Sequence, residues 1–149
     1  MGHITDMTLD ETKADIREEF SFLDDWEARY AHLIDLGKTN TPLAPEERNE
    51  QTRVRGCASQ VWLVSDTSQA GTLIFRAESD AMIVSGLIAL LLRLVSDRRP
   101  ADILAFDAAA FLEDIGVTGA LTAQRSNGLA SMIKRINDDA AAAARQEDA

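Results

Sequence analysis

Residues Ile83–Val95 form the most hydrophobic stretch of the chain, with apolar side chains on nearly every side of a helix drawn over them. A helix that is apolar nearly all round has to be enclosed by other elements, because a surface helix needs a polar face. The stretch is too short to span a bilayer, which takes roughly 20 apolar residues, and it contains Ser85, Gly86 and Arg93. The sequence therefore predicts a buried central helix.

Helical patterns precede and follow this stretch. Thr8 and Glu11 have the spacing of a capping box, which predicts that a first helix begins there. A second helix is expected from about Asp25 to Gly37, and short helices are expected at 100–106 and 107–115. The inner face of a last helix is expected to consist of Leu129, Met132, Ile133 and Ile136.

Two segments rich in β-branched and aromatic residues, 60–65 and 72–78, flank the turn residues 66–71 and predict an antiparallel hairpin. Residues 53–55 are expected to add a short third strand. Ser79 or Asp80 is expected to cap the central helix. Because the strands are grouped and do not alternate with helices, the predicted class is α+β, with a small antiparallel sheet of about three strands covered on one face by helices.

The length of 149 residues suits a single domain, 1–149, with residues 1–7 as a disordered tail or tag remnant and residues 141–149 as a fraying end. Fifteen basic and 25 acidic residues give a net charge of −10. Such a chain repels phosphate backbones and anionic lipid, so we expect neither nucleic acid nor a membrane as partner. We see no secretory signal and expect a cytoplasmic protein, as a monomer or weak dimer.

Cys57 is the only cysteine, and His32 is the only histidine outside the tag-like N-terminus. The chain therefore has no internal disulfide, and we expect neither a metal site nor a bound cofactor. A lone cysteine is often an inert core residue. Gly56, the small Ala58 and Ser59, and the position of Cys57 at a loop–strand junction favour an accessible thiol instead.

The segment Gly56-Cys57-Ala58-Ser59-Gln60-Val61-Trp62 resembles the G-C-x-S-Q-V-W signature of the SufE family of sulfur acceptors. Three further blocks, at 26–37, 79–89 and 125–133, are similar to segments of that family in the same order. The resemblance covers roughly residues 9–136. It implies a SufE/IscU-like fold.

The resemblance also implies a function. Cys57 would accept persulfide sulfur from a pyridoxal-phosphate-dependent cysteine desulfurase of the SufS or CsdA type, stimulate that desulfurase, and pass the sulfur to an iron–sulfur scaffold complex. The chain would then be a sulfur carrier with a covalent cysteine persulfide intermediate and an activator of the desulfurase, and whether it counts as an enzyme stays open. It lacks the further cysteines and the ligand histidine of IscU, so it is not expected to build a cluster.

Transfer of sulfur to Cys57 is thiol exchange on a persulfide, and it needs one nucleophilic thiolate and no second cysteine. Arg55 and Arg125 are candidates for a stabilising positive charge, although a solvated position at a strand edge is the favoured interpretation for Arg55. Asp80 is a candidate for holding the cysteine loop closed, beside its expected role as a helix cap. The expected supporting residues are Gly56, Ser59, Gln60, Asp80, Arg125 and Arg55.

Two alternatives remain open at this level. The chain could be a thiol redox sensor or regulatory binding module that uses its single cysteine, or a binding module in which Cys57 is inert. For the sulfur acceptor we hypothesise that Cys57 points inward in the free protein, where burial keeps the thiol protonated, and that the partner swings the loop outward.

Overall fold

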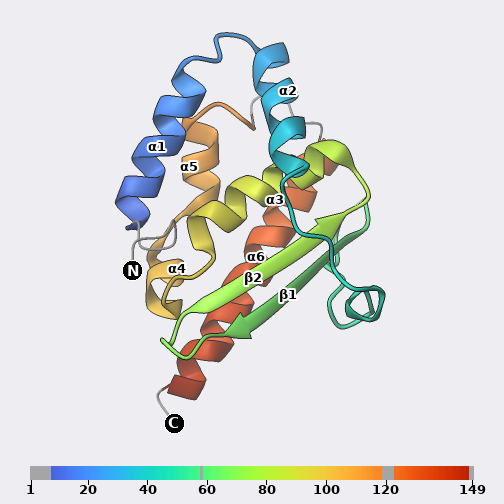
Figure 1. The fold of residues 1–149 in the computed structure, drawn as a ribbon, viewed down its shortest axis with the longest axis vertical. Coiled ribbons are helices and arrows are strands. Elements are labelled where there is room, and N and C mark those ends of the chain that lie inside the picture. Colours follow the sequence, from blue (N-terminus) through green and yellow to red (C-terminus); the bar gives the residue numbers. More distant parts are fainter. Residues whose placement is uncertain (1–7, 58, 119–122, 148–149) are drawn as a thin grey trace.

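The computed structural model describes residues 8–57, 59–118 and 123–147, without the side chains of 123–125 and 147. Figure 1 shows the strand hairpin beside the long helix α6, with α1, α2 and α5 gathered at the opposite end of the molecule and α3 between them. The elements are α1 (Leu9–Ser21), α2 (Trp26–Gly37), the 3-10 helix η2 (Pro45–Glu47), β1 (Val61–Thr67), β2 (Leu73–Ser79), α3 (Met82–Val95), α4 (Pro100–Ala105), α5 (Ala108–Asp114) and α6 (Ala123–Glu147).

Strands β1 and β2 pair antiparallel, in a register that runs from Val61 opposite Ser79 to Thr67 opposite Leu73. Side chains on one face of the hairpin are buried, whereas Ile74 on the other face is 38% exposed. Alternation along a strand places every second residue on the same face, which explains this pattern. The buried face consists of Val61, Leu63, Leu73, Phe75 and Ala77. The α+β class predicted from the sequence is confirmed.

The expected third strand is reduced to one bridge between Arg53 and Trp62, so the sheet of the described residues has two strands. Backbone hydrogen bonds join Val54 N to Val61 O and Leu63 N to Thr52 O, both at 2.8 Å. The pairing stops because the chain turns at Gly56, which has a φ of +87°. After that turn the chain leads into β1 at Val61, so the paired stretch stays limited to residues 52–54.

Helix α3 confirms the prediction of a buried central helix, because most of its residues are enclosed by the rest of the chain. It crosses α2 at very short range. A Cβ atom added at Gly86 would overlap the carbonyl oxygen of Leu33, and one added at Gly37 would lie 2.8 Å from the backbone nitrogen of Gly86. Only glycine permits the two backbones to approach this closely.

The start of α3 differs from the expected capping by Ser79 or Asp80. The N-cap residue is Ala81, which has no side chain that can accept a hydrogen bond. Ser79 Oγ accepts a hydrogen bond from Ala81 N at 3.2 Å, and the carboxylate of Asp80 turns to the backbone N–H of Gln60. The side chain of Asp80 therefore serves the segment before β1 and leaves the helix end uncapped.

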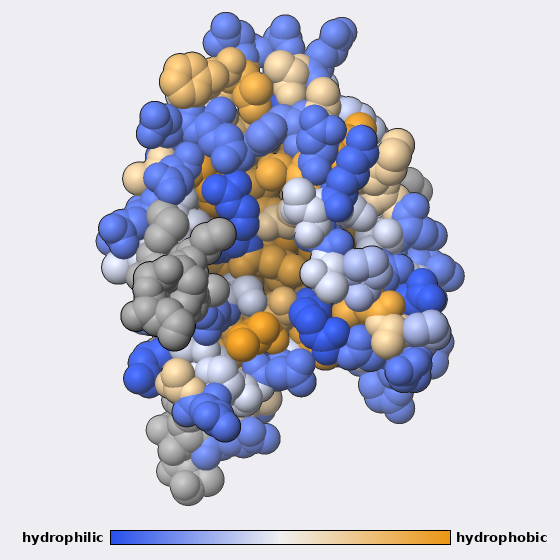
Figure 2. Space-filling view, viewed as in Figure 1, coloured by the Kyte–Doolittle hydropathy of each residue, from blue (hydrophilic) through white to orange (hydrophobic). Residues whose placement is uncertain are grey.

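The face of the molecule in Figure 2 is mainly hydrophilic, with small hydrophobic areas near its centre. Within the described ranges, none of the helices combines the length and the hydrophobicity that crossing a bilayer requires.

Candidate functional site

A tight turn before β1 presents Cys57. Gly56 is needed there for two reasons. Its φ of +87° lies in a region that L-residues rarely adopt, and a Cβ atom would come within 2.5 Å of Ser131 Oγ on α6. The turn therefore holds the backbone at Gly56 close against α6 and places Cys57 beside the same helix.

The sulfur of Cys57 lies on the backbone of α6. Its thiol donates a hydrogen bond to the carbonyl oxygen of Gly128 at 3.5 Å. A Cβ atom added at Gly128 would lie 3.6 Å from Sγ. The sulfur therefore packs directly on the backbone of α6 at a position that has no side chain. The Cys57 thiol is free and half-buried, and it packs against the edge of the hydrophobic core.

Two opposing effects act on the ionisation of Cys57. Burial raises the pKa of the thiol because the charged thiolate loses hydration, and the positive charge of Arg53 lowers the pKa in part. Burial has the larger effect, so the pKa of Cys57 is raised overall. The shift therefore favours the protonated thiol, the less nucleophilic form, in the resting protein.

Asp80 holds the segment that follows Cys57. Its Oδ1 accepts a hydrogen bond from Gln60 N at 3.1 Å, and its own backbone N–H donates to Gln60 O at 3.3 Å. This pair of bonds joins the end of the cysteine segment, defined here as residues 51–57, 59 and 60, to the start of α3.

The structure places the other predicted residues differently. Arg55 forms an ion pair with Glu50 at 2.9 Å, and both side chains are largely exposed. Ser59 is half-buried and Gln60 is exposed, and within the described parts of the chain neither side chain forms a hydrogen bond. The side chain of Arg125 lies outside the described residues.

Sequence reasoning missed four residues at this site: Arg53, Gly128, Ser131 and Arg135. Gly128 belonged to a block that resembles the SufE family, so a signal for it existed. Arg53 was considered only as part of a strand. The two α6 residues Ser131 and Arg135 lie more than 70 positions from the segment that they contact, and no local pattern marks them.

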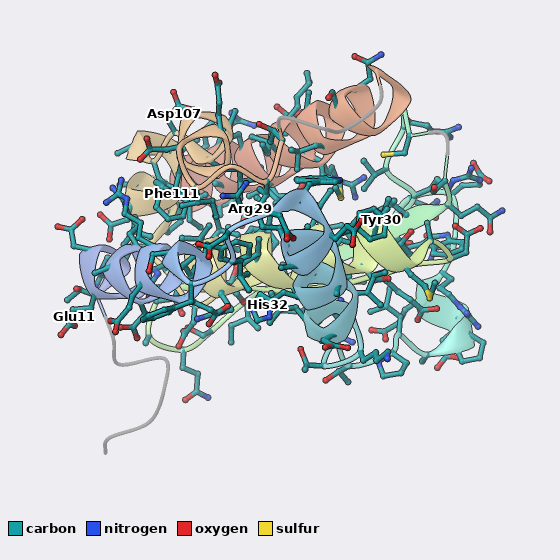
Figure 3. All side chains as sticks on the ribbon, turned by 90° about the horizontal axis from the view of Figure 1, so that it is seen from above. Glu11, Arg29, Tyr30, His32, Asp107 and Phe111 are labelled. Atoms are coloured by element: carbon teal, nitrogen blue, oxygen red, sulfur yellow. The ribbon has the colours of Figure 1, made fainter. Side chains whose placement is uncertain are left out.

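His32 belongs to a polar cluster with Glu19 and Arg93 and forms no contact with Cys57 among the described residues. Figure 3 shows Arg29, Tyr30 and His32 projecting from α2. His32 Nε2 lies 2.7 Å from Glu19 Oε2, and the same carboxylate lies 3.1 Å from Arg93 Nη1. In the parts of the chain that the structure describes, no group of three or more His, Cys, Asp or Glu side chains could hold a metal ion.

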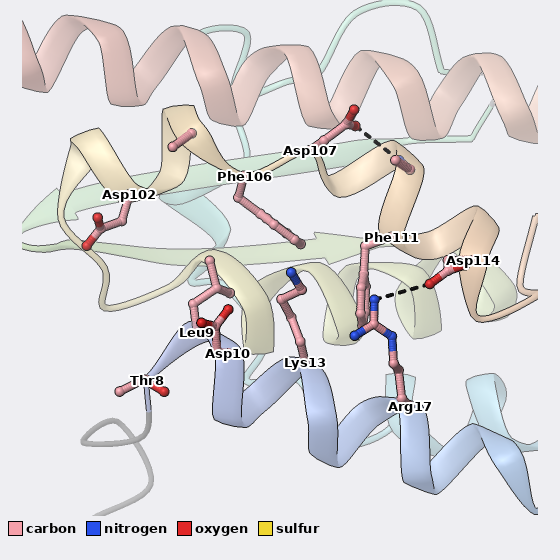
Figure 4. A pocket seen from close by; sticks show the side chains of 12 residues that line it. Thr8, Leu9, Asp10, Lys13, Arg17, Asp102, Phe106, Asp107, Phe111 and Asp114 are labelled. Atoms are coloured by element: carbon pink, nitrogen blue, oxygen red, sulfur yellow. Dashed lines mark hydrogen bonds and ion pairs between the residues drawn. The ribbon is translucent and has the colours of Figure 1, made fainter.

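A cleft of about 690 Å³ lies between α1 and the α4–α5 region (Figure 4). Lys13 Nζ lies 5.7 Å and 5.9 Å from the ring centres of Phe106 and Phe111, and Arg17 pairs with Asp114 at 3.1 Å. The lining includes no residue of the cysteine segment. The thiol chemistry of this chain is therefore confined to the other site, at Cys57.

Comparison with known proteins identifies relatives over most of the chain. Residues 14–140 match the family described as SufE, Fe–S metabolism associated domain. A SufE-like protein of Rhizobium etli, itself uncharacterised, is 47% identical over 128 residues, which are 84% of this chain and 86% of that protein. A second uncharacterised SufE-like protein, from Rhizobium meliloti, is 46% identical over 129 residues, which are 84% of this chain and 91% of the relative.

A solved structure shares the fold. The solution structure of a hypothetical protein from Thermus thermophilus superposes with a TM-score of 0.74 and covers 90% of this chain and 96% of its own. The two sequences are 20% identical, so this likeness concerns the fold alone.

Proposed function

The chain belongs to the SufE family of Fe–S metabolism associated domains, a membership that implies a role in sulfur transfer, and from this premise we propose that Cys57 accepts persulfide sulfur from a cysteine desulfurase and passes it to iron–sulfur cluster assembly. The observation that carries the proposal is the placement of the only thiol. Cys57 is free and half-buried, and it stands on a turn between two anchored segments. A thiol in this position can be kept protonated at rest and exposed by a movement of one short segment.

The proposed reaction exchanges one sulfur–sulfur bond for another. The Cys57 thiolate attacks the outer sulfur of the donor persulfide, and the bond between the two donor sulfurs breaks. The donor cysteine leaves as a thiolate, and Cys57 carries the transferred sulfur as a persulfide. The proton released by Cys57 balances the proton that the donor thiolate takes up, so no oxidant or reductant is needed. The chain needs no second cysteine for this step, and it has none.

We propose a SufS-type or CsdA-type desulfurase as the donor, with its pyridoxal phosphate in the partner, and an iron–sulfur scaffold complex downstream. Removal of the sulfur frees the donor cysteine for a new cycle, so the carrier stimulates the desulfurase. We assign this role to the cytoplasm, where reducing conditions keep a lone thiol free.

The test is the intact mass of the protein after incubation with a cysteine desulfurase and cysteine. The wild-type protein is expected to gain one or more sulfur atoms on Cys57 and to raise desulfurase turnover. Cys57→Ser is expected to do neither and to keep a thermal midpoint near that of the wild type, because the side chain is only half-buried and serine has nearly the same shape. Ser59→Ala is the matched control, since it removes a neighbouring hydroxyl and leaves the thiol.

Full stimulation of the desulfurase by Cys57→Ser would contradict the proposal. A wild-type protein that gains only one oxygen or a glutathione under peroxide, and no sulfur from the desulfurase, would support the redox-sensor alternative. The raised pKa of the Cys57 thiol speaks against that alternative, because oxidation sensors depend on thiolate character at rest.

A further inference from the structure

One face of α6 contacts residues 51, 53, 56 and 57 of the cysteine segment. Gly128 accepts the hydrogen bond from Cys57, Ser131 lies against Gly56, and Arg135 reaches the backbone of residues 51 and 53. Positions 128, 131 and 135 follow one another at helical spacing, so the three residues lie on one face of the helix. The segment therefore runs along about two turns of α6, in the direction opposite to the helix.

Arg135 makes the polar part of this contact. Its Nη2 donates a hydrogen bond to Gln51 O at 2.8 Å, and its Nη1 donates to Arg53 O at 3.3 Å. Both carbonyl groups belong to the short stretch that pairs with β1. Arg135 on α6 donates a hydrogen bond to each of them. The planar guanidinium group can reach both carbonyls at once, which a lysine ammonium on its flexible stem does not match.

The guanidinium is itself held in place. Arg135 Nε donates to Asp139 Oδ1 at 3.4 Å, one turn along α6, and Asp139 Oδ2 accepts from Ser65 Oγ of β1 at 3.1 Å. The side chains of Arg135 and Asp139 are 27% and 22% exposed. A chain of polar contacts thus connects β1, α6 and the start of the cysteine segment.

We propose that Arg135 is a positioning residue that holds the cysteine segment against α6 and so keeps Cys57 seated on Gly128 in the resting protein. Asp80 fixes the end of the segment at Gln60, and Arg135 fixes its beginning at Gln51 and Arg53. Val54 adds a buried side chain and a backbone bond to β1, so loss of Arg135 loosens the segment without detaching it. The importance of this contact for sulfur transfer rests on the proposed function, but the contact itself can be tested without a desulfurase.

The test compares Arg135→Gln with Lys134→Gln. Lys134 is the matched control, because it forms the same type of i,i+4 ion pair, with Asp138 at 2.8 Å. The side chain of Lys134 is 76% exposed. The rate of Cys57 alkylation by iodoacetamide is measured from pH 6 to 10. The plateau rate at high pH reports access to the sulfur, and the midpoint reports its pKa.

Arg135→Gln is expected to raise the plateau rate about fivefold, which corresponds to the loss of a hydrogen bond of ordinary strength. Arg135→Lys is expected to restore less than half of the lost protection, because the ammonium cannot bond both carbonyls. Lys134→Gln is expected to keep the wild-type rate. An unchanged rate in Arg135→Gln, or an equal rise in Lys134→Gln, would overturn the proposal.

Urea separates local positioning from general destabilisation. A local opening exposes little surface, so the alkylation rate of Arg135→Gln is expected to stay nearly constant in urea concentrations below the unfolding transition. A rate that rises with urea as steeply as global unfolding would assign the effect to loss of the fold and would contradict the positioning role. Failure of sulfur acceptance by the wild-type protein, in contrast, would contradict only the proposed function.

Discussion

The crossing of α2 and α3 and the seat of Cys57 on α6 both depend on glycine, yet the two contacts differ in kind. At the crossing, backbone lies on backbone in the buried interior, and an added methyl group at Gly86 would overlap the Leu33 carbonyl. At the cysteine, an added methyl group at Gly128 would lie at an ordinary contact distance of 3.6 Å from the sulfur. The crossing is held by close backbone packing, whereas the cysteine is held by one hydrogen bond across an ordinary contact distance.

The comparison separates a frame, the buried crossing of α2 and α3, from the cysteine segment, which polar contacts hold against its neighbours. Most of α3 is enclosed on every side, so its position is set by packing. The cysteine segment is held by a few polar contacts at half-exposed positions, each of which contributes about 0.5–1.5 kcal/mol. Losing one such contact changes the exposure of the thiol and leaves the frame intact.

The largest expected effect comes from Gly86→Ala, which tests the frame. The new methyl group forces α2 and α3 apart, and we expect the free energy of unfolding to fall by about 3 kcal/mol. Gly128→Ala is the matched control on α6. We expect it to change the free energy of unfolding by less than about 1 kcal/mol, because a helical alanine is intrinsically favourable. Urea unfolding measures both, and equal losses would remove the distinction between the two regions.

Asp80→Ala tests the segment and is expected to act mainly on the thiol. Loss of the bond to Gln60 N should raise the alkylation rate of Cys57 about fivefold, and the free energy of unfolding should fall by about 1 kcal/mol or less. Asp15→Ala, at an exposed position of α1, is expected to leave the alkylation rate unchanged. If Asp80→Ala lowered stability as much as Gly86→Ala, the cysteine segment would have to be counted as part of the frame.

The smallest expected effect concerns charge. Arg53 lowers the pKa of the Cys57 thiol against the larger effect of burial, so Arg53→Gln should raise that pKa further. Less thiolate is then present at pH 7.5, and alkylation should slow by about twofold, in keeping with the strength of charge interactions at half-exposed sites. Arg55→Gln removes an arginine that is paired with Glu50 in solvent and is expected to change neither the pKa nor the rate. Faster alkylation in Arg53→Gln would show that the arginine shields the sulfur.

The same shift has a consequence for stability. A thiol whose pKa is raised by folding is protonated in the folded protein at pH values where it already ionises in the unfolded chain. Its contribution to stability is therefore complete below the pKa of the unfolded thiol and is lost as the pH rises through the pKa of the folded one. Because the thiol is only half-buried, the contribution is small.

Sequence reasoning was successful where a local pattern determines the outcome. The periodicity of residues 83–95 predicts the buried helix, and the alternation around residues 66–71 predicts the hairpin. It named Asp80 as a candidate for holding the cysteine loop, and the bond to Gln60 agrees with that, but it was wrong to expect the same side chain to cap α3, because the carboxylate turns to the segment before β1. It considered Arg55 as the positive charge, although Glu50 takes up that side chain. The role of Arg135 depends on contacts across more than 80 positions of sequence, which only the packing of α6 reveals.

The hydrogen bond between Cys57 and Gly128 O exists only while the sulfur carries a proton, since a carbonyl oxygen can accept but cannot donate. Once the sulfur is ionised, the same oxygen faces an anion, and attraction becomes repulsion. In a persulfide on Cys57, Sγ is bonded to Cβ and to the outer sulfur and carries no hydrogen, so loading with sulfur would also remove the donor of this bond. Under the proposed function, the contact on α6 would therefore hold the empty carrier by a hydrogen bond that the loaded carrier cannot make.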